Sequence, residues 1–207
     1  VQAYAKDYCK ALGHVYTSRT IIITAMSGVA ATLLNGETTH SVVGLRRSGI
    51  TEAEKDAFLD ARLIIIDEIS FASPKDFYKM QIHICDLMNV RFQRYGGLSI
   101  VFAGDYSQLE PVKQPTVYGQ DGERVPDFHD SLNCFIELDG THRFKNDVPW
   151  GERLLRFREG FPTEEDIDVI NEECYGRDPP AVGVQVAAHR NCDRDAVNSA
   201  LFEDCCK

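Results

Sequence analysis

The chain has 207 residues, and its 43% hydrophobic and 26% charged content is typical of a folded globular protein. Its formal net charge of −10 excludes a histone-like protein that coats nucleic acid through bulk positive charge. No apolar run approaches the roughly 18 residues that span a bilayer, so no membrane segment is predicted. The seven cysteines contain no C-x-x-C pair, which favours reduced thiols in an intracellular protein over a disulfide framework or a zinc site.

The first part of the chain alternates helical and strand patterns. Apolar residues recur at helical spacing over 1–12, which predicts an amphipathic helix. The β-branched run 21–25 predicts a buried strand, the small residues 27–34 predict a helix, and Asn35-Gly36 predicts a turn. A charged helix is expected over 51–61. Its inward-facing residues are expected to be Ala53, Ala57 and Phe58.

Two further strands are predicted on either side of a long helix. The apolar run 63–68 predicts a second buried strand. The sequence 73–76 has the residues of a helix start: a serine cap, a proline at the first helical position and an acid three residues after the cap. Apolar residues over 77–88 give this helix one buried face, and Gly96-Gly97 breaks the chain before a third buried strand over 98–103.

This alternation of short apolar strands with helices predicts a doubly wound α/β fold, in which a parallel sheet is covered by helices. The first domain is expected to run over 1–130. Residues 131–207 are expected to begin a second, incomplete α/β unit. Its predicted elements are helices from 149 to about 160 and from 163 to 174, a strand over 184–188 and a helix over 193–202. In such sheets, ligands bind at the carboxyl ends of the strands.

The second predicted strand ends in two adjacent carboxylates, Asp67 and Glu68. Successive side chains at a strand end diverge, so Asp67 can hold Mg²⁺ through its water shell while Glu68 orients or deprotonates an attacking water. These two functions require separate carboxylates. The alternative is a strand that simply exits into polar solvent.

Gln108 follows the third predicted strand and is therefore expected at the same sheet edge as Asp67 and Glu68. Its amide could donate to a γ-phosphate or position a water, and coupling that contact to movement would make it a switch. The alternative is an ordinary turn, because a Gly-Asp pair after a strand is common turn chemistry.

The segment 24–31 is a third candidate for a site, because its small residues would let a ligand approach the backbone closely. Ser27 and Gly28 open a helix whose free N–H groups, with neighbouring hydroxyls, can hold a phosphate of a nucleic-acid backbone. The alternative is tight helix packing behind a capped helix start.

The order of these motifs resembles the Pif-type (petite integration frequency) DNA helicases, and Helitron transposon helicases are similar. The resemblance covers about 20–112, with 68–94 corresponding to the family's signature region. The residues that carry it are Thr24-Ala25, Ser27-Gly28-Val29-Ala30-Ala31, Gly36, Thr38-Thr39-His40-Ser41, Asp67-Glu68-Ile69-Ser70, Gly96-Gly97, Gly104-Asp105, Gln108-Leu109 and Pro111-Val112. Two positions depart from the family: Glu110 replaces a usual proline, and Met26-Ser27 replaces a commoner Ser-Thr pair.

The resemblance implies a RecA-like P-loop NTPase fold, with ATP and Mg²⁺ between two such domains. It implies that Glu68, Gln108 and Arg143 are catalytic and that, together with the Mg²⁺ ligand Asp67, they bind the nucleotide. Arg143 would reach the phosphates as an arginine finger, and the alternative is a surface arginine beside Trp150 and Phe144. Members of the family more often have a glutamine directly after this arginine, where this chain has Phe144. The nucleic-acid contacts it implies are Thr24, Ser27, Gly28, Thr38 and His40.

No Gly-Lys dipeptide occurs in the chain, so the phosphate-binding loop G-x-x-x-x-G-K-[ST] is absent. We expect the chain to be a fragment that lacks this loop and the strand before it, and to be inactive alone. The genomic sequence upstream of Val1 would distinguish a truncated enzyme from a protein that truly lacks the loop. A Gly-Lys-Ser or Gly-Lys-Thr there would support the enzyme. Its absence would favour a non-hydrolysing nucleic-acid-binding module.

The function implied by the resemblance is ATP-dependent 5′-to-3′ DNA unwinding by a superfamily-one helicase. Its substrates would be single-stranded DNA and duplex junctions, in DNA repair, recombination, replication and telomere maintenance. A eukaryotic source would place it in the nucleus or the mitochondrion. The alternative enzyme is a RecD-like helicase or exonuclease subunit, which matches the segment 38–41 less well.

Overall fold

The computed structural model describes residues 2–46, 49–119, 126–140, 142–174 and 191–205. It divides after Glu137 into two compact units, which we describe separately. In the part of the chain that the structure describes, no helix is both long enough and apolar enough to cross a membrane.

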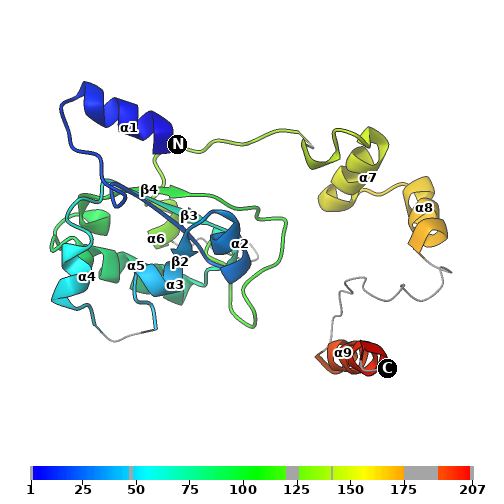
Figure 1. Ribbon diagram of the computed structural model, residues 1–207. Coiled ribbons are helices and arrows are strands. Elements are labelled where there is room, and N and C mark those ends of the chain that lie inside the picture. Colours follow the sequence, from blue (N-terminus) through cyan, green and yellow to red (C-terminus); the bar gives the residue numbers. More distant parts are fainter. Residues whose placement is uncertain (1, 47–48, 120–125, 141, 175–190, 206–207) are drawn as a thin grey trace. The chain divides into compact units, whose positions relative to one another are not determined.

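The first unit is built on a parallel sheet of four strands (Figure 1). The strands are β1 (Ile21–Ala25), β2 (Glu37–Thr38), β3 (Leu63–Asp67) and β4 (Ser99–Phe102). Their order across the sheet is β2-β1-β3-β4, and every neighbouring pair runs parallel. The predicted parallel α/β sheet is therefore confirmed.

The main hydrophobic core joins the sheet to α5 (Pro74–Leu87). Ile64 and Ile66 are fully buried against residues of this helix, including Phe77. Because side chains alternate along a strand, Leu63 and Ile65 face the other way, and both are only partly buried. The predicted face of α5 is also buried, apart from the half-buried Met88.

The third predicted strand exists as β4, but the prediction that it is buried is wrong. β4 lies at the edge of the described sheet and pairs only with β3. Its partly buried residues, Ile100 and Phe102, pack on the core, whereas Val101 on the opposite side is 46% exposed. An apolar run in a sequence cannot distinguish an edge strand from a central strand.

The predicted helix over 51–61 is shorter than expected. α4 (Glu52–Asp56) begins with a capping box in which Thr51 and Glu54 bond each other's backbone N–H groups. Beyond the helix, backbone bonds span three residues, as in the bond from the Phe58 N–H to the Lys55 carbonyl. These tighter turns bury Phe58 and Ala61, while Ala53 stays exposed.

Among the described residues, three other helices precede β3. The predicted amphipathic helix is α1 (Gln2–Ala11), but none of its residues is buried. α2 (Gly28–Leu33) begins after the cap Ser27, and α3 (Thr39–Val42) follows β2 directly.

The first unit also contains three short helical segments among its described residues. They are η1 (Ile69–Phe71), η2 (Arg94–Gly97) and α6 (Pro126–His129). Tyr95, Gly96 and Gly97 all have positive φ angles, so the predicted chain break at Gly96-Gly97 is confirmed.

The described part of the second unit is helical. It contains η3 (His142–Phe144), α7 (Val148–Glu159), α8 (Glu164–Cys174) and α9 (Asn191–Cys205). All three predicted helices of this unit are present, while the predicted strand over 184–188 lies outside the described residues.

The predicted turn at Asn35-Gly36 is confirmed, and it requires a glycine because the backbone passes close to β1. A Cβ atom on Gly36 would lie 2.4 Å from the carbonyl oxygen of Ile23, well inside van der Waals contact. Since Ile23 is in a strand whose position is fixed by pairing on both sides, its carbonyl cannot easily move.

We therefore expect Gly36→Ala to destabilise the chain by about 1 to 3 kcal/mol, the usual cost of overpacking. Urea denaturation followed by circular dichroism measures the change. Gly49→Ala is the control, because a Cβ there meets nothing within 4 Å. Equal stability of the two variants would show that the turn can move away from β1.

Candidate functional site

The candidate site lies where the parallel strands end, and backbone hydrogen bonds join these ends. The register pairs Ala25 with Asp67, the last residues of β1 and β3. Immediately beyond, the Met26 N–H donates to the Asp67 carbonyl at 2.9 Å. The predicted position of Asp67 at a carboxyl edge of the sheet is confirmed.

The second of the two adjacent carboxylates, Glu68, has a strained backbone conformation. Asp67 ends β3, and its Oδ1 accepts the Glu68 N–H at 3.0 Å. Glu68 has φ 57° and ψ 41°, in the left-handed region that non-glycine residues rarely adopt. Both side chains are partly exposed. Such strain costs about 1 to 3 kcal/mol and is often found at functional sites.

The loop after β4 is fixed beside Glu68. The Ile69 N–H donates to the Ala103 carbonyl at 3.0 Å. A Cβ on Gly104 would lie 3.1 Å from the Ile69 backbone nitrogen, so the two backbones approach closely. These contacts bring the start of the segment that carries Gln108 to the edge where Asp67 and Glu68 lie.

Gln108 itself is exposed and is held by Asp105, a residue of the motif to which the sequence analysis assigned no function. Its Nε2 donates to Asp105 Oδ2 at 3.0 Å, while Asp105 Oδ1 accepts the Ser107 N–H at 3.0 Å. The Asp-x-Ser pattern of this side-chain turn was the available signal. The ordinary turn offered as the alternative is thus present, and it holds the glutamine amide.

Tyr106 anchors the same loop through aromatic contacts. Its ring lies 4.7 Å from that of Tyr118 and 6.3 Å from that of Phe128, measured between ring centroids. Burial raises the pKa of Tyr106, with a further contribution from Tyr118. Because Tyr106 is two residues before Gln108, this cluster limits where the amide can reach.

The other candidate nucleic-acid residues lie at the β1 and β2 half of the same edge. Ser27 Oγ accepts the Ala30 N–H at 3.2 Å, so the capped helix start is the observed local geometry. Thr38 Oγ1 likewise caps α3 by accepting the Ser41 N–H at 3.3 Å. A hydroxyl that accepts a bond still has its own hydrogen to donate. Gly28 is exposed and His40 is partly exposed.

The prediction that Thr24 contacts nucleic acid is contradicted by its burial. Its side chain is 0% exposed, and its hydroxyl donates to the Ile65 carbonyl at 3.0 Å. Thr24 also accepts a hydrogen bond from Thr39, so both capacities of the hydroxyl are used inside the protein. Sequence position at the end of a strand cannot reveal on which side of the strand a hydroxyl is enclosed.

Arg143 lies in the second unit, on the exposed turn η3. The turn is joined to α7 because the Asp147 N–H donates to the Phe144 carbonyl at 2.8 Å. The arginine that lies over the Trp150 ring is Arg153, at 5.8 Å from the ring centroid. Arg143 is thus exposed, as the alternative of a surface arginine expects, but it is not the arginine that lies over Trp150.

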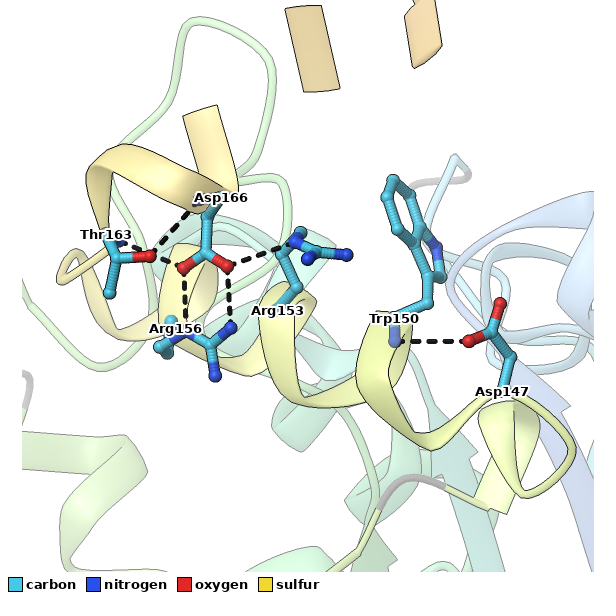
Figure 2. Close-up of polar contacts among 6 residues, drawn as sticks. All are labelled: Asp147, Trp150, Arg153, Arg156, Thr163 and Asp166. Carbon is cyan, nitrogen blue, oxygen red and sulfur yellow. Dashed lines mark hydrogen bonds and ion pairs between the residues drawn. The ribbon is translucent and has the colours of Figure 1, made fainter. Parts of the chain in front are cut away.

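A buried carboxylate joins α7 to α8, and the sequence analysis did not single it out (Figure 2). Asp166 is 1% exposed and accepts two hydrogen bonds from Arg156, at 2.7 and 2.6 Å. Arg153 donates to it at 3.0 Å, as does the Thr163 N–H. The hydrogen bonds from Arg156 hold the pKa of this carboxyl well below its usual range, and the bonds from Thr163 lower it further.

Ser70 has an unusual environment next to the candidate carboxylates. It is 0% exposed, and within the described structure its Oγ has no hydrogen-bond partner. Ser73, which is 2% exposed, differs because its Oγ accepts the Asp76 N–H at 3.2 Å and donates to the Asp76 carboxylate at 2.7 Å. The predicted helix start at 73–76 is confirmed.

Comparisons with known proteins agree with the family indicated by the motifs. The model of the family described as PIF1-like helicase matches residues 9–134. The ATP-dependent DNA helicase PIF1 of Saccharomyces cerevisiae (strain YJM789) is 24% identical over 173 residues, which cover 75% of this chain and 19% of that protein. The ATP-dependent DNA helicase Pif1 of Psychrobacter sp. (strain PRwf-1) is 33% identical over 103 residues, covering 44% of this chain and 16% of that protein.

Solved structures of Pif1 helicases share the fold. The Candida albicans Pif1 helicase gives a TM-score of 0.70 at 22% identity, covering 96% of this chain and 46% of that one. The Bacteroides Pif1 helicase in complex with ADP-AlF3 and ssDNA gives a TM-score of 0.67 at 19% identity, covering 96% of this chain and 49% of that one. These likenesses confirm the predicted RecA-like α/β fold. The chain spans about half of these solved chains and at most 19% of the two curated relatives.

The ion pairs of Asp166 predict how α7 and α8 respond to mutation and acid. Asp166→Asn should speed amide hydrogen exchange in α7 and α8 several-fold at pH 7, because the neutral amide loses the ion pairs. A lowered pKa means that the stabilisation is complete above about pH 4 and is lost only as the pH falls through the lowered value. Exposed Asp168 on α8 provides the control Asp168→Asn. Equal exchange in both variants would contradict the structural importance of Asp166.

The two buried serines predict stability changes of opposite sign. Ser70→Ala removes a hydroxyl without a protein partner and should stabilise the chain by up to about 1 kcal/mol. Ser73→Ala removes the cap of α5 and should destabilise it by about 1 kcal/mol. Urea unfolding of both variants tests this. A loss of stability in Ser70→Ala would mean that its hydroxyl is satisfied in solution.

Proposed function

Because the chain belongs to the PIF1-like helicase family, we propose that it is part of an ATP-dependent DNA helicase. The observation that supports this most directly is the shared sheet edge. On it, the β3 and β4 half carries Asp67, Glu68 and the Gln108 loop. The β1 and β2 half carries Ser27 and Thr38. The first half would hydrolyse ATP and the second would contact DNA.

The carboxylates suit a magnesium-dependent hydrolysis. Carboxylate oxygens are ligands that Mg²⁺ prefers, and Asp67 and Glu68 are both accessible, so these residues fit the ion. Asp67 would hold Mg²⁺, which when bound neutralises charge on the phosphates. Glu68 would orient the attacking water and take its proton.

Gln108 and Arg143 would respond to the nucleotide. The Gln108 amide would exchange its bond with Asp105 for one with the γ-phosphate, which links the loop after β4 to nucleotide state. Arg143 would neutralise charge on the transferring phosphoryl group, a function worth about 10³ to 10⁵ in rate where it has been measured.

Single-stranded DNA is the proposed substrate of the β1 and β2 half. Ser27, Gly28, Thr38 and His40 would contact its backbone through hydroxyl, amide and imidazole groups. The Bacteroides Pif1 structure with ssDNA supports this substrate class. Thr24 is not among the proposed contacts because it is buried.

The biological setting follows from the substrate. We propose 5′-to-3′ unwinding at duplex junctions, in DNA repair, recombination, replication and telomere maintenance. A DNA substrate implies an intracellular location, which in a eukaryote would be the nucleus or the mitochondrion. The family match favours a Pif-type enzyme over the RecD-like alternative.

This chain has no Gly-Lys dipeptide, which the phosphate-binding loop contains. Nucleotide assays therefore use the longest encoded protein that contains this chain, which we call the complete protein. In it, Glu68→Gln should lower the ATP hydrolysis rate by about 10² to 10⁴ while nucleotide binding persists, because only proton transfer is removed. Steady-state hydrolysis and equilibrium nucleotide binding measure the two effects. Exposed Glu159 supplies the control Glu159→Gln. Near-normal turnover in Glu68→Gln would reject its assignment as the base.

A further inference from the structure

Two buried threonines form a directed chain of hydrogen bonds between three elements of the first unit. Thr39 Oγ1 donates to Thr24 Oγ1 at 3.0 Å, and Thr24 Oγ1 donates to the Ile65 carbonyl at 3.0 Å. Both side chains are 0% exposed. The chain therefore runs from α3 through β1 to β3, entirely inside the protein.

The two ends of this hydroxyl chain lie beside the two halves of the candidate site. Thr39 is the first residue of α3, and its sequence neighbours are Thr38 and His40, the proposed DNA contacts. Ile65 lies on β3 two residues before Asp67, the proposed magnesium ligand. The bond from the Met26 N–H to the Asp67 carbonyl connects β1 to the same end of β3.

The chemistry of the buried hydroxyls indicates a directional link rather than simple packing. Valine has nearly the shape of threonine and would fill the same volume without needing hydrogen-bond partners. Hydrogen bonds in the low-dielectric interior are strengthened when they polarise one another in series. A movement of Thr39 therefore changes the bond that Thr24 makes to β3.

We propose that Thr39 is a positioning residue that couples DNA contact at α3 to hydrolysis at the end of β3. The proposal rests on the proposed function. DNA bound by Thr38 and His40 would fix α3, and Thr39 would transmit this through Thr24 to the strand that carries Asp67 and Glu68. Thr39 touches neither substrate in this scheme.

The test measures the ratio of ATP hydrolysis with saturating oligo(dT) to hydrolysis without DNA, in the complete protein. Thr39→Val keeps the shape but removes the donor, and the ratio should fall about fivefold, the factor expected for one hydrogen bond of about 1 kcal/mol. Thr39→Ser restores the hydroxyl and should recover most of the ratio. Thr32→Val is the matched control, since it removes the exposed bond from Thr32 to the Gly28 carbonyl on α2.

The double variant Thr24→Val/Thr39→Val separates the hydroxyl chain from general destabilisation. It replaces both hydroxyls with apolar groups of the same shape, so that neither hydroxyl is left buried without the other. If the hydroxyls act in series, its ratio should be no lower than that of Thr24→Val alone. If Thr39→Val alone does not fold, the comparison of the double variant with Thr24→Val still tests the coupling.

The outcomes distinguish this inference from the proposed function. An unchanged ratio in Thr39→Val, an additive loss in the double variant, or failure of Thr39→Ser to recover would overturn the coupling while leaving the helicase assignment intact. Wild-type hydrolysis that does not respond to oligo(dT) would instead reject the proposed function, and the coupling with it. A ratio that falls equally in Thr32→Val would also overturn the inference.

Discussion

The parallel pairing of β1 with β3 is the constraint on which the rest of the first unit depends. Its register runs unbroken from Ile21 with Leu63 to Ala25 with Asp67. Because both strands end together, the chain segments that follow them start at one edge. A shift of one residue would reverse which side chains face α5 and would remove Ile64 and Ile66 from the core. The hydrophobic alternation of β3 thereby fixes the position of its terminal carboxylate.

Local strain at this edge is maintained by contacts from neighbouring elements. Glu68 keeps its left-handed conformation between a paired strand end and η1, whose first N–H bonds the chain after β4. Gly104 permits that close backbone contact. The same edge holds the Gln108 amide against Asp105. Backbone contacts thus fix Glu68 and the chain after β4 relative to each other, whereas a side chain holds the Gln108 amide.

Two arginines of α7 in the second unit are paired with an internal carboxylate. The sequence gathers arginines around 153–158, a pattern typical of a solvated charged face. Two of them, Arg153 and Arg156, instead donate to the buried Asp166. An ionised carboxylate that is almost fully buried needs such partners, because desolvation would otherwise favour its neutral form. These ion pairs therefore join α7 to α8.

The sequence by itself determined the features that depend on neighbouring residues. The cap at Ser73, the turn at Asn35-Gly36 and the strand that ends in Asp67 all use local hydrogen bonds or a simple hydrophobic period, and the motif order indicated the family. Tertiary structure decided what long-range packing controls: the burial of Thr24, the exposed side of β4 and the partners of Asp166. The physical reason is that a local sequence pattern specifies which hydrogen bonds a residue can make. Burial and distant partners depend on elements that meet only when the chain folds.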